Sequence, residues 1–153
     1  MKICIDSDDA AVNLKKVLFD HLKSKGIDIT DLDYSSTKKG ALYPEIGYHL
    51  AKQIQNGNYD RGISICGTGL GMSMIANKVE GVYAGVCHDV YSAERLRKSN
   101  DAQVITMGER VIGPELAKTI IDAWLVSEFL GGGSTPKVQQ MRELEKKSFH
   151  PER

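Results

Sequence analysis

The chain has 153 residues, of which 41% are hydrophobic and 26% are charged. This length fits one globular domain, and this composition is typical of a chain that folds by burying one core. Twenty basic and twenty acidic side chains give a formal net charge of zero, which argues against nucleic acid as a partner. The first apolar run is too short for a signal peptide, and no window approaches the roughly 18 apolar residues that span a bilayer. We therefore expect a cytoplasmic protein with no membrane partner.

Short apolar runs alternate along the chain with segments of helical periodicity. Residues 2–5 predict a strand, and a polar turn leads from it to a helix in which Val12, Leu14 and Leu18 recur at helical spacing. The next elements, in chain order, are a strand at 27–32, a polar loop at 35–40, a helix at 43–54, a strand at 62–65, a helix at 72–77, a strand at 82–86, a helix at 91–98, a strand at 104–107 and an amphipathic helix that begins at Pro114 and includes Phe129.

Five strands that alternate with helices predict an α/β protein of three layers, α/β/α. Parallel neighbours need crossover connections, and these place helices on both faces of a five-stranded parallel sheet. The glycine-rich segment 131–134 divides this body, residues 1–130, from a tail, residues 131–153, that is helical from 138 to 147. Val138, Met141 and Leu144 share one side of the tail helix and have little core of their own to join. We expect this helix to be exchanged or packed at a subunit interface.

The most distinctive segment follows the third predicted strand and reads Cys-Gly-Thr-Gly-Leu-Gly from Cys66 to Gly71. Glycines let a backbone turn tightly and approach a ligand, and amides at a helix N-terminus favour negative charge. The segment therefore indicates an anion site, with a tight turn that binds nothing as the alternative. The lysine of a phosphate-binding P-loop is missing and the glycine spacing is not the dinucleotide fingerprint, so nucleotide binding is disfavoured.

The three cysteines have no metal-ligand spacing, and no metal is expected. Cys66 lies at the mouth of the glycine turn, where amide dipoles would favour a thiolate that acts as base or nucleophile; the alternative is a small buried side chain. Cys4 lies inside the first strand and is expected to be buried. Cys87 directly precedes His88 and Asp89, but side chains that are neighbours in sequence point in different directions. We therefore expect His88 and Asp89 to begin a helix rather than to form a catalytic triad with Cys87.

Polar side chains at two loops are further candidates. Asp8 and Asp9 follow the first strand, where carboxylates can move protons or hold hydroxyls, or can simply cap a helix. Ser99 and Asn100 precede the fifth strand, where a plain loop is the alternative.

Together these segments resemble the type B ribose-5-phosphate isomerases, a family that includes galactose-6-phosphate isomerase subunits and allose-6-phosphate isomerases. The most specific match is the stretch 65–73, followed by 75–79 and Gly81. Supporting matches are Asp8, Tyr43-Pro44, Tyr91-Ser92-Ala93, Asn100-Asp101, Gly108, Arg110-Val111-Ile112-Gly113 and Ala123-Trp124-Leu125.

The resemblance implies a Rossmann-like domain that forms a homodimer or homotetramer with active sites shared between subunits. It implies an aldose–ketose isomerase of sugar phosphates that needs no organic cofactor or metal and works through a cis-enediolate. By this resemblance Cys66 is the base between C1 and C2, and Thr68 assists it. The other implied roles are proton shuttling by Asp8, oxyanion stabilisation by the amides of Gly67, Gly69 and Gly71, pocket lining by Tyr43, enediolate binding by Asn100 and phosphate binding by Arg110 and Lys137.

Four positions depart from the family pattern. Asp9 replaces a histidine in the substrate site, and Ser99 replaces the histidine associated with opening the sugar ring. Gly133 and Lys137 replace two arginines that bind phosphate, and lysine lacks the fork of a guanidinium. Two interpretations follow: an isomerase for another pentose, hexose or open-chain tetrose phosphate, or a sugar-phosphate-binding subunit that is non-catalytic or depends on a paralogous chain.

Overall fold

The computed structural model describes residues 1–151, and a parallel five-stranded sheet forms its centre. The strand order is β2-β1-β3-β5-β4, and every neighbouring pair is parallel. The strands are β1 (Ile3–Ser7), β2 (Ile29–Asp31), β3 (Arg61–Cys66), β4 (Ala84–Val86) and β5 (Val104–Gly108). The order makes β3 the central strand, so the glycine turn that follows it emerges from the middle of the sheet.

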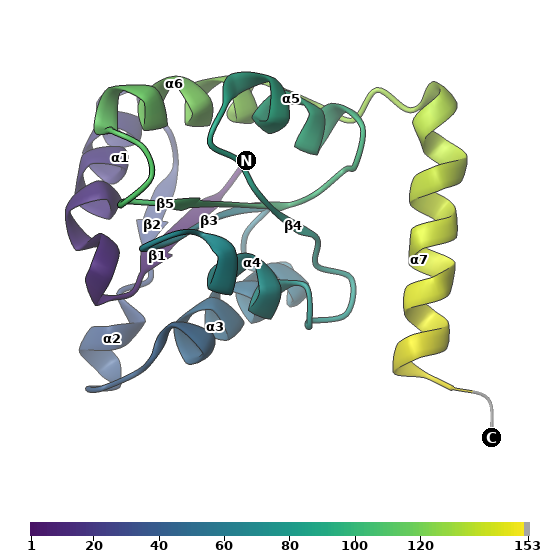
Figure 1. Ribbon diagram of the computed structural model, residues 1–153, viewed down its shortest axis with the longest axis horizontal. Helices are drawn as coiled ribbons and strands as arrows, with labels where there is room; N and C mark the ends of the chain where they lie inside the picture. The colour runs from purple at the N-terminus through teal and green to yellow at the C-terminus, as the bar shows by residue number, and fades with distance from the viewer. Residues whose placement is uncertain (152–153) are drawn as a thin grey trace.

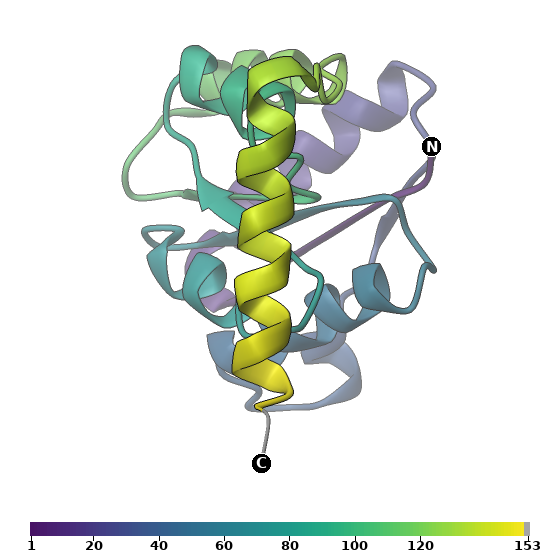
Figure 2. The same ribbon diagram turned by 90° about the vertical axis from the view of Figure 1, so that its right-hand side faces the viewer.

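Helices cover both faces of the sheet, which confirms the predicted three-layer α/β/α fold (Figure 1). The helices on one face are α1 (Val12–Ser24), α5 (Val90–Lys98) and α6 (Pro114–Leu125), and those on the other are α3 (Tyr43–Gln55) and α4 (Leu70–Ala76), with the short α2 (Tyr34–Thr37) beside α3. The last helix, α7 (Thr135–Phe149), stands beside the body and runs past both layers of helices (Figure 2).

The core is divided by the sheet, because successive residues of a strand point to opposite faces. In β1, Ile3 and Ile5 pack among the residues of α1 and α6, whereas Cys4 between them packs with Leu50 of α3. All five residues of β1 are buried. Such strands, apolar on both sides, produce the continuous apolar runs that the sequence shows.

Several element boundaries differ from the prediction. Helix α6 ends at Leu125 instead of reaching Phe129, because the buried Arg61 guanidinium donates to the carbonyl oxygens of Trp124, Leu125 and Ser127 at 2.9 to 3.0 Å. These bonds satisfy the terminal carbonyls of the helix.

The other differences are shorter strands and additional or longer helical segments. Strands β2 and β4 are shorter than the predicted strands at 27–32 and 82–86. Helix α2 occupies part of the predicted polar loop, α4 begins two residues earlier than predicted, and 3₁₀ turns form at Asp9–Ala11 and Gly132–Ser134. The second of these turns lies in the glycine-rich linker, and it leads directly into α7, which is longer than the predicted helix.

Helix α7 is attached to its own body mainly by polar contacts. Arg142 donates to Asp101 at 2.7 Å, and Glu145 accepts from the Tyr83 hydroxyl at 2.5 Å. Val138 is buried, but Leu144 remains 56% exposed and Phe149 43% exposed. The packing of this helix at a subunit interface therefore stays a prediction.

Candidate active site

The glycine turn lies at the carboxyl edge of the sheet, between β3 and β5. Gly69 has a φ of 78°, and a Cβ placed on it would lie 2.8 Å from the backbone of Met107. Gly108 meets the backbone of Thr68 in the same way, with an ideal Cβ only 2.5 Å away. The turn therefore requires glycine on both sides, because two backbones pass here without room for a side chain.

Cys66 is the cysteine that belongs to this turn. Its side chain is 6% exposed, and its sulfur accepts a hydrogen bond from the Gly69 amide at 3.1 Å. Thr68 is exposed beside it, and its hydroxyl oxygen accepts from the Leu70 amide at 3.3 Å. Burial raises the pKa of both Cys4 and Cys87 to about 12, so these two thiols stay protonated at neutral pH.

Asp8 caps the first turn after β1 and also faces the site. Its carboxylate accepts from the Ala10 amide at 3.1 Å, which is the capping role that the sequence left open. Burial raises the pKa of the Asp8 carboxyl, and neighbouring Asp9 adds to the rise while the Ala10 amide and Arg110 oppose it. A carboxyl with a raised pKa is suited to proton transfer.

Tyr43 and Arg110 fit against two of the glycines. The Tyr43 ring lies against Gly71, where an ideal Cβ would be 2.5 Å from the ring, and the Arg110 guanidinium lies against Gly67, where an ideal Cβ would be 3.1 Å from Nη1. A hollow of about 630 Å³ beside them is lined by Asp8, Asp9 and Tyr43, among others. We call this set of residues, with Cys66 and the turn 67–71, the carboxyl-edge site.

Lys15 is a residue of this hollow that the sequence analysis missed. It is 7% exposed on α1 and lies within 3.0 Å of Asp31, 3.6 Å of Asp6 and 3.8 Å of Asp33. Burial raises the pKa of Asp6, and Lys15 opposes that rise. The sequence did place Lys15 on the otherwise apolar, inward face of its helix, and this position could have indicated a buried charge. Nothing in the sequence showed which three carboxylates surround it.

The remaining candidates gather elsewhere, in a hollow of about 720 Å³ between α5 and α7. Ser99, Asn100 and Lys137 line it together with Arg95, which the sequence analysis also missed. We call it the α5–α7 pocket.

The carboxyl-edge site and the α5–α7 pocket lie at opposite edges of the sheet. In the parallel pair of β3 and β5, Val104 pairs with Gly62, and Gly108 pairs with Cys66. The loop with Asn100 precedes β5, so it lies at the amino edge, and the four residue steps from Val104 to Gly108 alone span about 13 Å. One chain therefore does not bring Asn100 or Lys137 to Cys66.

His88 and Asp89 act as the sequence predicted and begin a helix. Asp89 caps α5 by accepting from the Ser92 amide at 2.7 Å. His88 Nε2 accepts from the Gly108 amide at 2.9 Å, and burial lowers the pKa of the imidazole, so the neutral form is favoured. Cys87 instead packs in the core, which agrees with the rejection of a triad.

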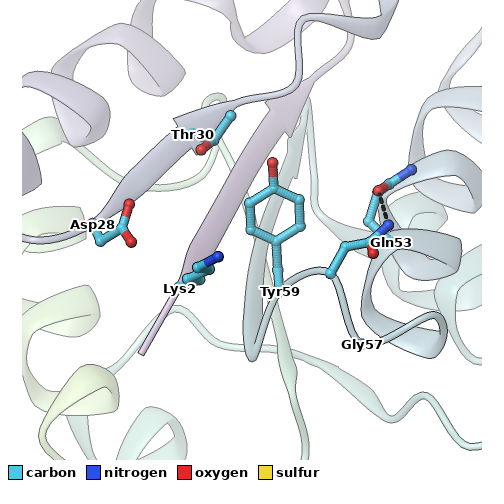
Figure 3. A pocket seen from close by; sticks show the side chains of 7 residues that line it. Lys2, Asp28, Thr30, Gln53, Gly57 and Tyr59 are labelled. Atoms are coloured by element: carbon cyan, nitrogen blue, oxygen red, sulfur yellow. Dashed lines mark hydrogen bonds between the residues drawn. The ribbon is translucent and has the colours of Figure 1, made fainter.

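A further hollow of about 530 Å³ lies where β1 begins (Figure 3). Lys2, Asp28 and Tyr59 line it, and none of the candidate residues does. Within residues 1–151, no group of three or more His, Cys, Asp or Glu side chains is arranged to hold a metal ion.

Substitution of Gly69 by alanine tests the tightness of the turn. The positive φ alone should cost about 1 to 2 kcal/mol, and the contact with the Met107 backbone should raise the loss further. Gly57→Ala is the matched control, since its φ is 73° and nothing lies within 4 Å of its ideal Cβ. Urea unfolding should show a larger loss for Gly69→Ala, and equal losses would contradict the close backbone approach.

Comparisons with known proteins agree with this fold. A family model described as Ribose/Galactose Isomerase matches residues 3–141. A protein of Pectobacterium atrosepticum named D-erythrulose-4-phosphate isomerase is 52% identical over 98% of this chain and 99% of its own length. A Listeria innocua protein named Ribose-5-P isomerase B is 49% identical over 97% of this chain and 99% of its own. The solved ribose-5-phosphate isomerase B of Clostridium thermocellum superimposes with a TM-score of 0.91 at 44% identity, covering 97% of this chain and 99% of that one.

The fold, the glycine turn and these comparisons together define an α/β sugar isomerase. The chain belongs to the ribose/galactose isomerase family, whose enzymes are intramolecular oxidoreductases of the aldose–ketose type. The resemblance in the sequence is confirmed at this level. No helix within residues 1–151 combines the length and apolarity needed to cross a membrane.

Proposed function

We propose that the chain interconverts the aldose and ketose forms of an open-chain tetrose 4-phosphate, with Cys66 as the base. The observation that carries this substrate is the state of Ser99, whose oxygen accepts a hydrogen bond from Arg95 Nε at 2.8 Å. A serine hydroxyl is a far weaker acid than a protonated imidazole, so Ser99 does not supply the proton that opening a sugar ring requires. A tetrose with phosphate on O4 has no free hydroxyl placed to close a five-membered ring on C1, so it needs no such acid.

The carboxyl-edge site supports proton transfer between C1 and C2. The Cys66 thiolate removes the proton from one carbon, which leaves a cis-enediolate, and the resulting thiol returns the proton to the other carbon. The amides of Gly67, Gly69 and Gly71 are the donors proposed for the enediolate oxygen. Asp8, with its raised pKa, moves the hydroxyl proton between O1 and O2, while Thr68 and Tyr43 border the reacting end.

The Pectobacterium relative's name supports a four-carbon substrate, whereas the Listeria relative's name refers to ribose 5-phosphate. The two identities differ by little, so overall similarity does not choose between these substrates. Ser99 favours the tetrose for the chemical reason given above.

Each complete site is proposed to form between two copies of the chain. Asn100 and Lys137 lie at the amino edge and Cys66 at the carboxyl edge, so a second copy has to supply one of the two sets. The exposed Met141 and Leu144 of α7 offer apolar surface for that contact. A homodimer, alone or paired into a tetramer, satisfies this requirement.

A kinetic comparison tests the substrate. Purified protein should isomerise D-erythrulose 4-phosphate with a kcat/KM about 100-fold or more above that for ribose 5-phosphate, since most of the pentose is closed into rings that Ser99 does not open. Exchange of solvent deuterium into C1 or C2, followed by NMR, reports the same step. A preference for ribose 5-phosphate would contradict the tetrose assignment.

The separated half-sites also favour a second candidate, a subunit that is active only with a paralogous chain. In that case the purified chain alone binds sugar phosphates and shows a ligand-dependent rise in melting temperature without turnover. Activity that appears only after addition of a paralogue would select this function.

A further inference from the structure

Arg95 is oriented by a neighbour on its own helix. Residues four apart on a helix share a face, and Arg95 donates to the Ser99 hydroxyl oxygen through both Nε, at 2.8 Å, and Nη2. These bonds fix the plane of the guanidinium by using one edge of it. Since the Ser99 oxygen accepts both bonds, the hydroxyl proton remains available for another acceptor.

Arg95 also lacks the carboxylate partner that three of the other arginines within residues 1–151 have. Arg97 and Arg142 pair with Asp101, and Arg61 pairs with Glu128. Among residues 1–151, Arg95 enters no ion pair, and Arg110 in the carboxyl-edge site is the other arginine of which this is true. Each half of the divided site thus contains one arginine that forms no ion pair within residues 1–151.

The charge of the α5–α7 pocket is uniformly positive. Arg95 and Lys137 line it, together with the uncharged Tyr91, Ser134, Ser99 and Asn100, and no aspartate or glutamate is among the lining residues. Two like charges that face one pocket repel each other, and an anion between them removes that repulsion. The hollow of about 720 Å³ is large enough for a small phosphate ester.

We propose that Arg95 is the main ligand of the substrate phosphate in the α5–α7 pocket, where it adds a guanidinium to Lys137, the phosphate-binding position that the family resemblance implies, and to the Ser99 hydroxyl. This inference rests on the proposed function, and it assigns recognition to a residue outside the predicted site. Arg95 supplies the planar, multiple-donor geometry that Lys137 does not have. Asn100 lines the same pocket, so a phosphate bound there lies beside a residue to which the resemblance assigns substrate binding.

Titration with inorganic phosphate tests the pocket without requiring turnover. Arg95→Ala should weaken phosphate binding to the full-length protein by roughly 10- to 100-fold in calorimetry, the loss expected for charge-assisted hydrogen bonds. The phosphate affinity of Arg95→Lys should lie between those of the wild type and Arg95→Ala, because lysine keeps the positive charge but not the planar set of donors of the guanidinium. Lys98→Ala is the matched control on the same helix: Lys98 pairs with Glu94 at 3.1 Å and should leave phosphate binding unchanged. If Arg95→Ala does not fold, Arg95→Gln takes its place.

Kinetics separate this inference from the proposed function. Arg95→Ala should raise KM for the sugar phosphate by a similar factor and change kcat much less. An active enzyme whose KM and phosphate affinity are unaffected by Arg95→Ala overturns the inference and leaves the isomerase intact. Phosphate binding that depends on Arg95, in a protein that isomerises no sugar phosphate, overturns the proposed function alone. Loss of oligomer in sedimentation, with phosphate affinity retained, would instead assign Arg95 to a contact between copies and overturn the inference.

Discussion

Replacement of Cys66 by alanine should lower the isomerisation rate by about 10²- to 10⁴-fold, the contribution of a positioned general base. The loss should appear in kcat, because the proposed thiolate acts on the C–H proton in the transition state and adds little to substrate binding. Loss of deuterium exchange between solvent and the C1 and C2 positions would show that proton transfer itself has failed. Cys66→Ser should be nearly as slow, since a serine hydroxyl is a much weaker acid than a thiol and is rarely ionised.

Cys4→Ala is the matched control for this experiment. Cys4 is fully buried in β1, and its pKa of about 12 keeps it protonated, so its loss should reduce stability without removing turnover. Unchanged deuterium exchange in Cys66→Ala would transfer the role of base to another group, of which Asp8 is the nearest candidate by position and raised pKa.

Two inactive variants should restore activity to each other when they are mixed. Asn100→Ala removes a residue of the α5–α7 pocket, and Cys66→Ala removes the base, so each variant alone should have two defective sites per dimer. A mixed dimer has one site in which both defects meet and one that is intact. After unfolding and refolding together, random pairing should recover about a quarter of the wild-type activity.

Variants within one half of the site provide the control for this experiment. Cys66→Ala mixed with Gly69→Ala should recover little, because both defects fall on the same set of residues and every site of the mixed dimer contains one of them. Recovery by neither mixture, with dimers present in sedimentation, would rule out sites shared between copies of this chain and would favour the paralogous-partner function.

The order of elements followed from local patterns, because alternation of apolar runs and glycine-ended helices reflects backbone geometry that neighbouring residues determine. The end of α6 could not be predicted from local patterns, since it depends on Arg61. This residue precedes the end of the helix by more than 60 residues and contacts it only in the folded chain. Lys15 was missed for the same reason, as its carboxylate partners come from separate segments.

The candidate site was predicted unevenly. The glycine turn and Asp8 are local features at strand ends, and the structure places them together with Tyr43 and Arg110. Arg95 lies one helical turn before Ser99, so the sequence offered it as a candidate. An arginine on an amphipathic helix usually faces solvent, however, and the sequence does not distinguish a solvent-facing arginine from one that lines a pocket. The predicted order of elements already implies that Asn100 and Cys66 lie at opposite edges of the sheet, since in a parallel sheet a residue before one strand and a residue at the end of another are at opposite ends.

The contacts of α7 affect how the enzyme would behave on dilution. Arg142 donates to Asp101, next to Asn100, and so connects α7 with the loop that lines the α5–α7 pocket. On the proposed function, a substrate bound between two copies touches both, and by mass action it strengthens their association. Specific activity would then fall as protein concentration approaches the dissociation constant of the dimer, and saturating substrate would shift that fall to lower concentration.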